Sequence, residues 1–366
     1  MYIYILIFLL VLIYAGRKST KKNRSFNIIL AIVCLFLSTG YMTGSDWRGY
    51  ELDYSDNEYF DSFEYLYASI IFLANKIGLS FWHYTIFSKI LGFILFINLY
   101  GKLCRNKYGL VFWFSFFALF LWINHPARNF LAIILFSYAI YEAVNCNIIK
   151  YMFWCILATA CHSSCAIFIP LYFYLTKRGT KRYVIDIAII IVTFFTSSIM
   201  RTYLDPLASI AFFSRINSYT LDEEYQGSMS MGIFVLIVAF LIMYLVKIDK
   251  IRKFSQHADF IYRCGLTYGF LFALANMSTI LFRLPLYMML PFSVFIGYLC
   301  SSSLESFRIR YKYIVIAVSF YYMIHIITSD YSYVPYSSYM QYAFQEKPSY
   351  NKRFMYNYSN SPYNKK

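Results

Sequence analysis

Hydrophobic residues in this chain gather in long blocks that are separated by short polar stretches. Each block runs for roughly 17 to 25 residues, the length that a helix needs to cross a hydrocarbon layer of ~30 Å. Strands of a membrane barrel would instead show short segments of alternating polarity. A backbone inside lipid must also satisfy its own hydrogen bonds, which a helix does within one segment. The pattern therefore predicts an all-α, polytopic transmembrane helical bundle.

We expect about 10 to 12 membrane spans from these blocks. Ten of them are read directly, at residues 1–15, 26–42, 81–101, 108–124, 129–146, 183–200, 230–246, 260–281, 284–301 and 312–328. Two further segments allow more than one interpretation. Residues 64–79 form either a span or an external helix that lies on the membrane, and residues 151–176 form either one long span or two short helices broken near His162.

Basic clusters between the blocks set the orientation. The loop from Arg17 to Arg24 holds five Lys and Arg residues, which places it in the cytoplasm and the N-terminus outside. If 64–79 stays outside and 151–176 enters and leaves as a hairpin, the later basic clusters also fall on the cytoplasmic side. The opposite choice moves the cluster at 102–107 outside. The charge bias therefore favours the first topology.

The chain divides into a transmembrane region and a polar end. We expect residues 1–330 to form a single transmembrane domain, with an acidic external loop at 43–63 and a second external loop at 201–229. Residues 331–366 are rich in Tyr, Ser and Asn. That composition predicts a mobile C-terminal tail, at least beyond Glu346.

Composition and charge exclude several classes of protein. Only 14% of the residues are charged and 60% are apolar, unlike a soluble chain. The net charge of +15 comes from short clusters in loops, which argues against binding of nucleic acid. The eight Cys are scattered through apolar blocks and fit small buried residues better than a metal site. No Walker, dinucleotide, HExxH or Gly-x-Ser-x-Gly motif occurs, so we expect neither a cofactor nor a metal.

Under the preferred topology, five polar residues converge on the external face. Asp46 and Arg48 open the first external loop, Arg128 precedes a span, His162 lies at the break of the hairpin, and Arg283 follows a span. The basic clusters that set the orientation did not include these residues. Their convergence predicts a cavity that opens to the outside.

The residue types suggest a chemistry for this cavity. The planar fork of Arg suits a diphosphate, although a single Arg at a helix end can also reach lipid phosphates. His162 is a candidate for proton transfer, and the alternative is a buried histidine with a purely structural hydrogen bond. Lys89, within a predicted span, is a functional hypothesis because a charge there is costly.

Five short motifs occur in order between residues 40 and 336: Gly44-Ser45-Asp46-Trp47-Arg48-Gly49-Tyr50, Arg128-Asn129-Phe130-Leu131-Ala132, the stretch 157–166 around His162, Arg283-Leu284-Pro285-Leu286-Tyr287, and Val334-Pro335-Tyr336. Together they resemble the EpsG-like family of Wzy-type polysaccharide polymerases. The resemblance implies a fold similar to GT-C-like membrane glycosyltransferases. It also implies location in the bacterial inner membrane and a role in the synthesis of O-antigen (lipopolysaccharide), capsule or exopolysaccharide.

The resemblance implies a substrate and roles for individual residues. Such enzymes join oligosaccharide repeat units carried on undecaprenyl diphosphate at the periplasmic face. Arg128 and Arg283 would hold the donor diphosphate, and His162 or Asp46 would deprotonate the acceptor hydroxyl. Arg48 and Tyr287 are further candidates for substrate binding. The candidate site residues are therefore Arg128, Arg283, His162, Asp46, Arg48 and Tyr287. A chain-length regulator and a flippase of the same pathway are the implied partners, besides the lipid bilayer.

Two other functions stay open on the sequence alone. A flippase for the same lipid-linked unit would suit a bundle of about a dozen helices, but it should show internal repeats, and none is apparent. A membrane acyltransferase that modifies surface glycan would need a site facing its acyl donor, usually on the cytoplasmic side. The gathering of charged residues on the external face favours the polymerase.

Overall fold

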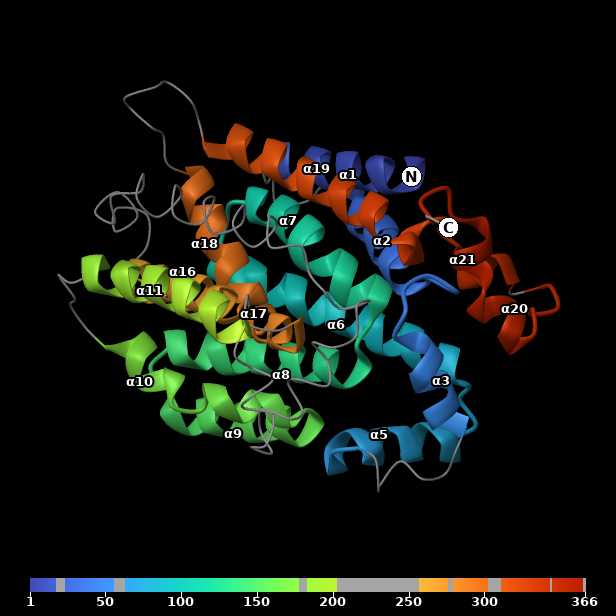
Figure 1. The fold of residues 1–366 in the computed structure, drawn as a ribbon, viewed down its shortest axis with the longest axis horizontal. Coiled ribbons are helices and arrows are strands. Elements are labelled where there is room, and N and C mark those ends of the chain that lie inside the picture. The colour runs from blue at the N-terminus through green and yellow to red at the C-terminus, as the bar shows by residue number, and fades with distance from the viewer. Residues whose placement is uncertain are drawn as a thin grey trace. The chain divides into compact units, whose positions relative to one another are not determined.

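The computed structural model describes residues 1–17, 24–55, 63–177, 183–202, 257–275, 279–301, 311–342 and 344–364. Within these ranges every regular element is a helix, and β-pairing is limited to an isolated bridge between Gly40 and Ser338 (Figure 1). Three of the described helices are long and apolar enough to cross a membrane: α6 (Phe81–Leu103), α8 (Ala127–Val144) and α19 (Tyr311–Ser329). The prediction of a helical membrane protein is confirmed.

Helices also occupy most of the other predicted spans and the segment 151–176. They are α1 (Tyr2–Gly16), α2 (Arg24–Ser38), α7 (Tyr108–Trp113), η1 (Phe114–Asn124), α9 (Ile148–Cys161), α10 (Leu171–Thr176), α11 (Tyr183–Thr202), α16 (Ala258–Ala275) and α18 (Met289–Ser301). The predicted span at 230–246 lies outside the described residues, as does the predicted loop at 201–229 apart from its first two residues.

The two ambiguous segments both resolve into short helices. Helix α5 (Tyr65–Lys76) has 12 residues, or about 18 Å at 1.5 Å per residue, which is too short for a span. The segment 151–176 is broken at His162 and continues as the 3-10 helix η2 (Ser163–Phe168) and then α10. The Tyr151 hydroxyl donates to the Phe168 carbonyl at 2.6 Å, so the chain folds back on itself.

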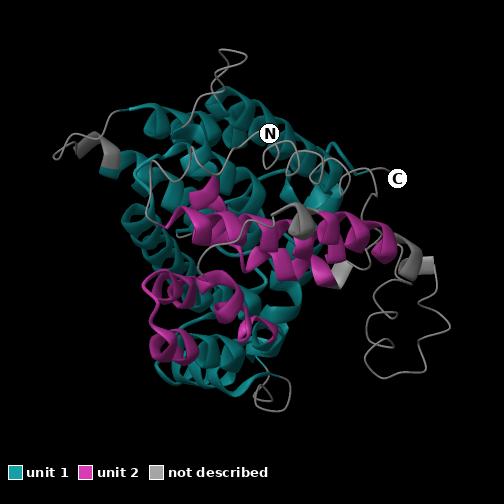
Figure 2. Ribbon diagram, turned by 90° about the vertical axis from the view of Figure 1, so that its left-hand side faces the viewer, with its two compact units in different colours: residues 1–136, 154–166, 296–366 teal, residues 137–153, 167–295 magenta. Residues whose placement is uncertain are grey.

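The described residues pack as two compact units (Figure 2). Unit 1 comprises Met1–Phe136, Trp154–Ala166 and Ile296–Lys366; unit 2 comprises Ser137–Phe153 and Ile167–Phe295. Within unit 2, the four-residue helix α17 (Arg283–Leu286) and the 3-10 turn η4 (Thr279–Phe282) pack on α16.

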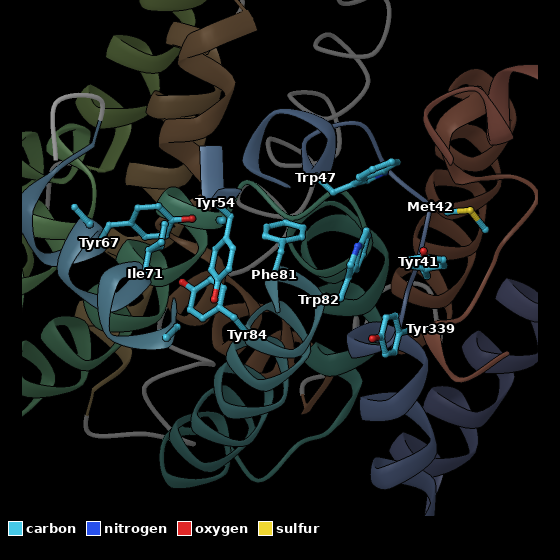
Figure 3. Close-up of a cluster of buried hydrophobic side chains, with 13 residues drawn as sticks. Tyr41, Met42, Trp47, Tyr54, Tyr67, Ile71, Phe81, Trp82, Tyr84 and Tyr339 are labelled. Atoms are coloured by element: carbon cyan, nitrogen blue, oxygen red, sulfur yellow. The ribbon is translucent and has the colours of Figure 1, made fainter. Parts of the chain in front are cut away.

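A cluster of buried aromatic residues lies in unit 1 (Figure 3). It joins helix α3 (Trp47–Ser55), helix α5 and the start of α6. Figure 3 shows that Trp47, Trp82, Tyr41 and Tyr339 gather on one side of the cluster, while Tyr54 and its neighbours lie toward α5. We call this set of buried rings the aromatic cluster. Helices α3 and α5 thus both contribute buried side chains to the same core.

A close backbone approach joins the motif at residue 44 to the end of η1. Gly44 has a φ of +85°, and a Cβ there would lie 2.6 Å from the Ile123 carbonyl oxygen, so only glycine fits. The next residue, Ser45, donates its backbone N–H and its hydroxyl to Asn124 Oδ1 at 2.6 and 2.9 Å. His125, with a φ of 53°, then ends the π-helix η1.

The C-terminal tail is folded rather than mobile, contrary to the prediction. It forms the 3-10 turns η5 (Tyr331–Tyr333) and η6 (Tyr339–Tyr342) and the short helices α20 (Tyr350–Phe354) and α21 (Tyr356–Asn360). The backbone N–H of Tyr41 donates to the Ser337 carbonyl at 2.8 Å, and that of Tyr339 donates to the Thr39 carbonyl at 2.7 Å. The Tyr4 hydroxyl donates to the Tyr333 carbonyl at 2.6 Å. These bonds attach the tail to α1 and to the end of α2.

Candidate functional site

One carboxylate, that of Glu64, collects three partners in unit 1. Arg128 Nη1 donates to Oε2 at 3.1 Å, and His162 Nδ1 lies 3.1 Å from Oε1. Ser163 donates its backbone N–H to the same Oε1 at 2.9 Å and its hydroxyl at 3.2 Å. Both oxygens are therefore bonded, one to a guanidinium and the other to an imidazole. We call these four residues the Glu64 cluster.

Each member of the Glu64 cluster lies where a helix begins or ends. Glu64 is the N-cap of α5, with an extended backbone. Pro126 precedes α8 and accepts the Phe130 backbone N–H at 2.8 Å, which leaves Arg128 in the first helical turn. His162 follows the last residue of α9. Because helix ends leave backbone N–H groups unpaired, the break at His162 is also what frees the Ser163 N–H for the carboxylate.

Aromatic rings hold the arginine of the cluster from a second side. The Arg128 guanidinium carbon lies 4.9 Å from the centre of the Phe63 ring, within the range of a cation–π interaction. Tyr50 from α3 also interacts with Arg128, and its ring lies 6.2 Å from that of Phe63 and 6.3 Å from that of Tyr67. The arginine is thus positioned by α3 and α5 together.

The site is partly buried but open to solvent. The side chains of Arg128, Glu64 and His162 are 26%, 19% and 14% exposed. Partial burial strengthens the interaction between these charges and still lets a ligand reach them. Glu64 uses Nη1 of Arg128, Tyr50 also hydrogen-bonds the guanidinium, and Nε is buried, so a phosphate would accept from the remaining Nη donors.

Glu64 is ionised at every working pH. Burial would raise the pKa of its carboxyl, but the hydrogen bonds from His162 and from the Ser163 backbone, together with the charge of Arg128, outweigh burial and hold the pKa well below its ordinary value. An ionised carboxylate only accepts hydrogen bonds. The His162 Nδ1 that faces it therefore carries a proton, and in a neutral imidazole the lone pair is on Nε2.

This arrangement can perform proton transfer next to an anion site. An imidazole whose Nδ1–H is held by a carboxylate is fixed in orientation, and the imidazolium that forms when Nε2 takes a proton is stabilised. Within the described residues, no hydrogen bond to His162 Nε2 is formed. A substrate hydroxyl at Nε2 would complete the arrangement. No group of three or more His, Cys, Asp or Glu side chains that could hold a metal occurs in the part of the chain that the structure describes.

Of the residues predicted from sequence, Arg128 and His162 meet in the Glu64 cluster. Asp46 instead lies beside Asn124, where its Oδ1 accepts the Ser45 hydroxyl at 3.1 Å. The Arg48 guanidinium lies 4.6 Å from the centre of the Phe354 ring in the tail. The structure thus places Asp46 and Arg48 in unit 1, each with partners of its own.

Arg283 and Tyr287 belong to unit 2. Arg283 begins the short helix α17, and its side chain is partly exposed. Tyr287 is fully buried, with its ring 4.8 Å from that of Phe168, which is a packing role. The Glu64 cluster is built without either residue, and their part in substrate binding stays a prediction.

The sequence reasoning missed Glu64. It placed this residue at the start of the segment 64–79 and gave it no role. One signal was present: Glu64 begins the segment 64–79, which the preferred topology puts on the same face as Arg128 and His162. An acid on that face was the natural partner for both.

Lys89 lies fully within α6 and is 2% exposed. Its backbone carbonyl accepts the Trp122 indole N–H at 2.9 Å, which joins α6 to η1. The contact concerns the backbone of Lys89 and assigns no function to the ammonium group.

Comparison with known proteins identifies a family. The model of the EpsG family matches residues 23–338 of the chain. This stretch contains every member of the Glu64 cluster. No curated protein and no solved structure matches.

Proposed function

Because this chain belongs to the EpsG family, we propose that it polymerises oligosaccharide repeat units linked to undecaprenyl diphosphate. The family suggests a polysaccharide polymerase-type role and a lipid-linked oligosaccharide substrate, and the helices suit a membrane protein. The finer proposal places the reaction at the periplasmic face of the bacterial inner membrane. The product is the chain of an O-antigen, a capsule or an exopolysaccharide.

The observation that carries the proposal is the sharing of the Glu64 carboxylate between His162 and Arg128. Glycosyl transfer from a diphosphate needs a base for the acceptor hydroxyl and positive charge for the leaving group. The cluster supplies both types of group within one carboxylate's reach. A flippase has no need of an oriented base.

The proposed step is a substitution at the anomeric carbon of the donor. The acceptor hydroxyl oxygen attacks the anomeric carbon of the donor, and the bond from that carbon to the diphosphate oxygen breaks. His162 Nε2 takes the hydroxyl proton, and Glu64 stabilises the resulting imidazolium. The lipid diphosphate leaves with the bonding electron pair, and its negative charge is met by Arg128.

The remaining predicted residues enter the proposal in secondary roles. Asp46 orients a sugar hydroxyl or serves as an alternative base, and Arg48 adds positive charge on the same face. Arg283 is proposed to bind the donor diphosphate and Tyr287 to bind substrate; both belong to unit 2. A chain-length regulator and a flippase of the same pathway are the proposed partners.

Deletion of the protein tests the proposal. Surface glycan should then carry a single repeat unit, because assembly and export of the unit are intact and only joining is lost. Restoring the wild-type chain should restore long glycan, whereas His162→Gln at the same membrane level should not.

The alternatives predict other phenotypes. Loss of a flippase would leave units facing the cytoplasm and no repeat at the surface, and loss of an acyltransferase would leave long chains that lack the acyl group. Either result, with the rest of the pathway intact, would overturn the proposal.

A further inference from the structure

We propose that Arg353 in the tail and Glu51 in α3 are positioning residues for the Glu64 cluster. This inference rests on the proposed function and adds a part of the chain, the folded tail, that the chemistry itself does not use. The structure provides a continuous set of contacts from the tail through α3 and α5 to Glu64, all within unit 1.

The first contact is the ion pair between Arg353 and Glu51. Arg353 Nη1 donates to Glu51 Oε2, and the two side chains are 11% and 15% exposed. Arg353 Nε also donates to the Pro348 carbonyl at 3.0 Å, so the guanidinium is fixed within the tail. Trp82 Nε1 donates to the other carboxylate oxygen, Glu51 Oε1, at 3.0 Å. A partly buried charge pair with a second donor is costly to break from one side.

Aromatic rings surround this guanidinium. The guanidinium carbon lies 5.5 Å from the centre of the Trp47 ring, 5.6 Å from Tyr350 and 5.9 Å from Tyr41. Trp47 and Tyr41 belong to the aromatic cluster in Figure 3. Arg353 is thus held by a carboxylate and by three ring faces, a stronger attachment than an exposed ion pair.

Helix α3 transmits this attachment to α5 and to the site. The residue before Glu51 is Tyr50, which interacts with Arg128. One turn further on, the Tyr54 hydroxyl donates to the Leu79 carbonyl at 2.8 Å, and Asn75 Nδ2 donates to the Tyr54 carbonyl at 3.1 Å. Asn75 lies near the C-terminal end of α5, and Glu64 is the N-cap of the same helix. Helix α3 therefore contacts the end of α5 through Tyr54 and contacts Arg128 through Tyr50.

A second set of contacts joins α3 to the tail. The Tyr350 hydroxyl donates to the Arg48 carbonyl at 2.9 Å, and the Arg48 guanidinium lies over the Phe354 ring. Asn357, which is fully buried, donates to the Ser332 carbonyl at 2.9 Å. Because Glu51 follows Tyr50 in α3, release of Arg353 from Glu51 would loosen the Tyr50 side chain and with it the placement of Arg128.

The test compares Arg353→Met with Lys352→Met, a matched control because Lys352 is the exposed neighbour in the same helix. Two readouts are taken at equal membrane levels. One is the rate at which chymotrypsin releases a C-terminal epitope tag, which reports docking of the tail without reference to activity. The other is the kcat and the donor KM for joining of purified lipid-linked repeat units.

Arg353→Met should speed release of the tag about tenfold and lower kcat about tenfold, with little change in donor KM, because small misplacement of reacting groups acts on the chemical step. Arg353→Lys should recover part of both effects, since it keeps the charge and the ring contacts but loses the fork. Lys352→Met should change neither readout.

Glu51→Gln provides a second route if Arg353→Met accumulates poorly, because the amide oxygen still accepts from Trp82. Combining Glu51→Gln with Arg353→Met should be no worse than the stronger single change, as expected for residues that act as one unit. A tail released by either variant with kcat unchanged overturns the inference and leaves the proposed function intact. Failure of the wild-type protein to join purified lipid-linked repeat units overturns the proposed function, while the tag-release result still reports on tail docking.

Discussion

Glu64 and Glu51 form two clusters in unit 1 with the same plan. Each carboxylate uses one oxygen for an arginine, Arg128 or Arg353, and the other for a ring nitrogen. In each case the arginine also lies over an aromatic ring. The difference is the ring that donates: an imidazole in one cluster and an indole, that of Trp82, in the other.

This difference decides what each cluster can do. An imidazole has a second nitrogen that can take and release a proton near neutral pH, whereas an indole only donates a hydrogen bond. The Glu64 cluster can therefore move a proton to and from a substrate, and the Glu51 cluster can only hold its partners in place. A carboxylate paired with an arginine is not a catalytic feature by itself; in the proposed mechanism the third partner, His162, supplies the base.

The largest expected effect comes from removing the imidazole. His162→Gln keeps a side-chain N–H for Glu64 but has no basic nitrogen, so the rate of repeat-unit joining should fall about 100- to 10,000-fold. The rate is measured with purified protein and lipid-linked repeat units. His83→Gln is the matched control, because His83 Nδ1 also has a hydrogen-bond partner, the Ser80 hydroxyl at 2.9 Å. A His162→Gln variant with near-normal rate would remove the base from the mechanism.

Removing the charge of Glu64 should have the next largest effect. Glu64→Gln still accepts from Ser163 but no longer stabilises the imidazolium, and loss of one charge-assisted hydrogen bond of about 1.5–3 kcal/mol corresponds to a roughly 10- to 150-fold slower rate. The same change at Glu51 should cost less. Equal losses at the two positions would mean that both carboxylates only hold structure.

The stability of the protein should depend on pH through Glu64. Because folding lowers the pKa of this carboxyl below its ordinary value of 4.5, its contribution is complete above that pH and is lost as the pH falls toward the folded-state pKa. The thermal unfolding midpoint in detergent should thus drop less between about pH 6 and about pH 3.5 for Glu64→Gln than for the wild type. An identical drop would argue against the hydrogen bonds described for Glu64.

The smallest effect is expected from Trp82→Phe. The phenyl ring keeps the packing of the aromatic cluster but loses the N–H that Glu51 accepts, at a cost of about 1 kcal/mol. The unfolding midpoint should fall slightly while the rate of joining stays close to that of the wild type. A rate loss as large as that of His162→Gln would contradict the distinction between the two rings.

The long helices were predictable because their signal is local. The spans predicted at 81–101 and 312–328 agree with α6 and α19 to within two residues. The third predicted span, at 129–146, began two residues after the start of α8, because Arg128 was taken as the boundary. Pro126 lets the helix begin at Ala127 and places the arginine in its first turn. A polar residue at the start of an apolar block can thus belong to the first turn of the helix, as Arg128 does.

The pairings within the site could not be predicted in this way. His162 and Arg128 were identified from residue type and from their expected side of the membrane, but the contact between Glu64 and His162 joins positions 98 apart. Nothing local specifies such a contact. The prediction for the tail failed for a related reason, because its polar composition suggests disorder. Its Tyr and Asn side chains donate hydrogen bonds to backbone carbonyls, and side chains of the tail contact the rings of Trp47 and Tyr41, which are distant in sequence.

The bond between Tyr4 and Tyr333 spans 329 positions of the chain, and this has a consequence for biosynthesis. The ribosome synthesises Tyr4 in α1 long before Tyr333, whose carbonyl accepts the bond. At about 5–20 residues per second, the synthesis of these two residues is separated by roughly 15 to 70 s. During that interval the Tyr4 hydroxyl must find another partner, such as water or a lipid head group. Assembly of this part of unit 1 therefore cannot finish until Tyr333 has been synthesised.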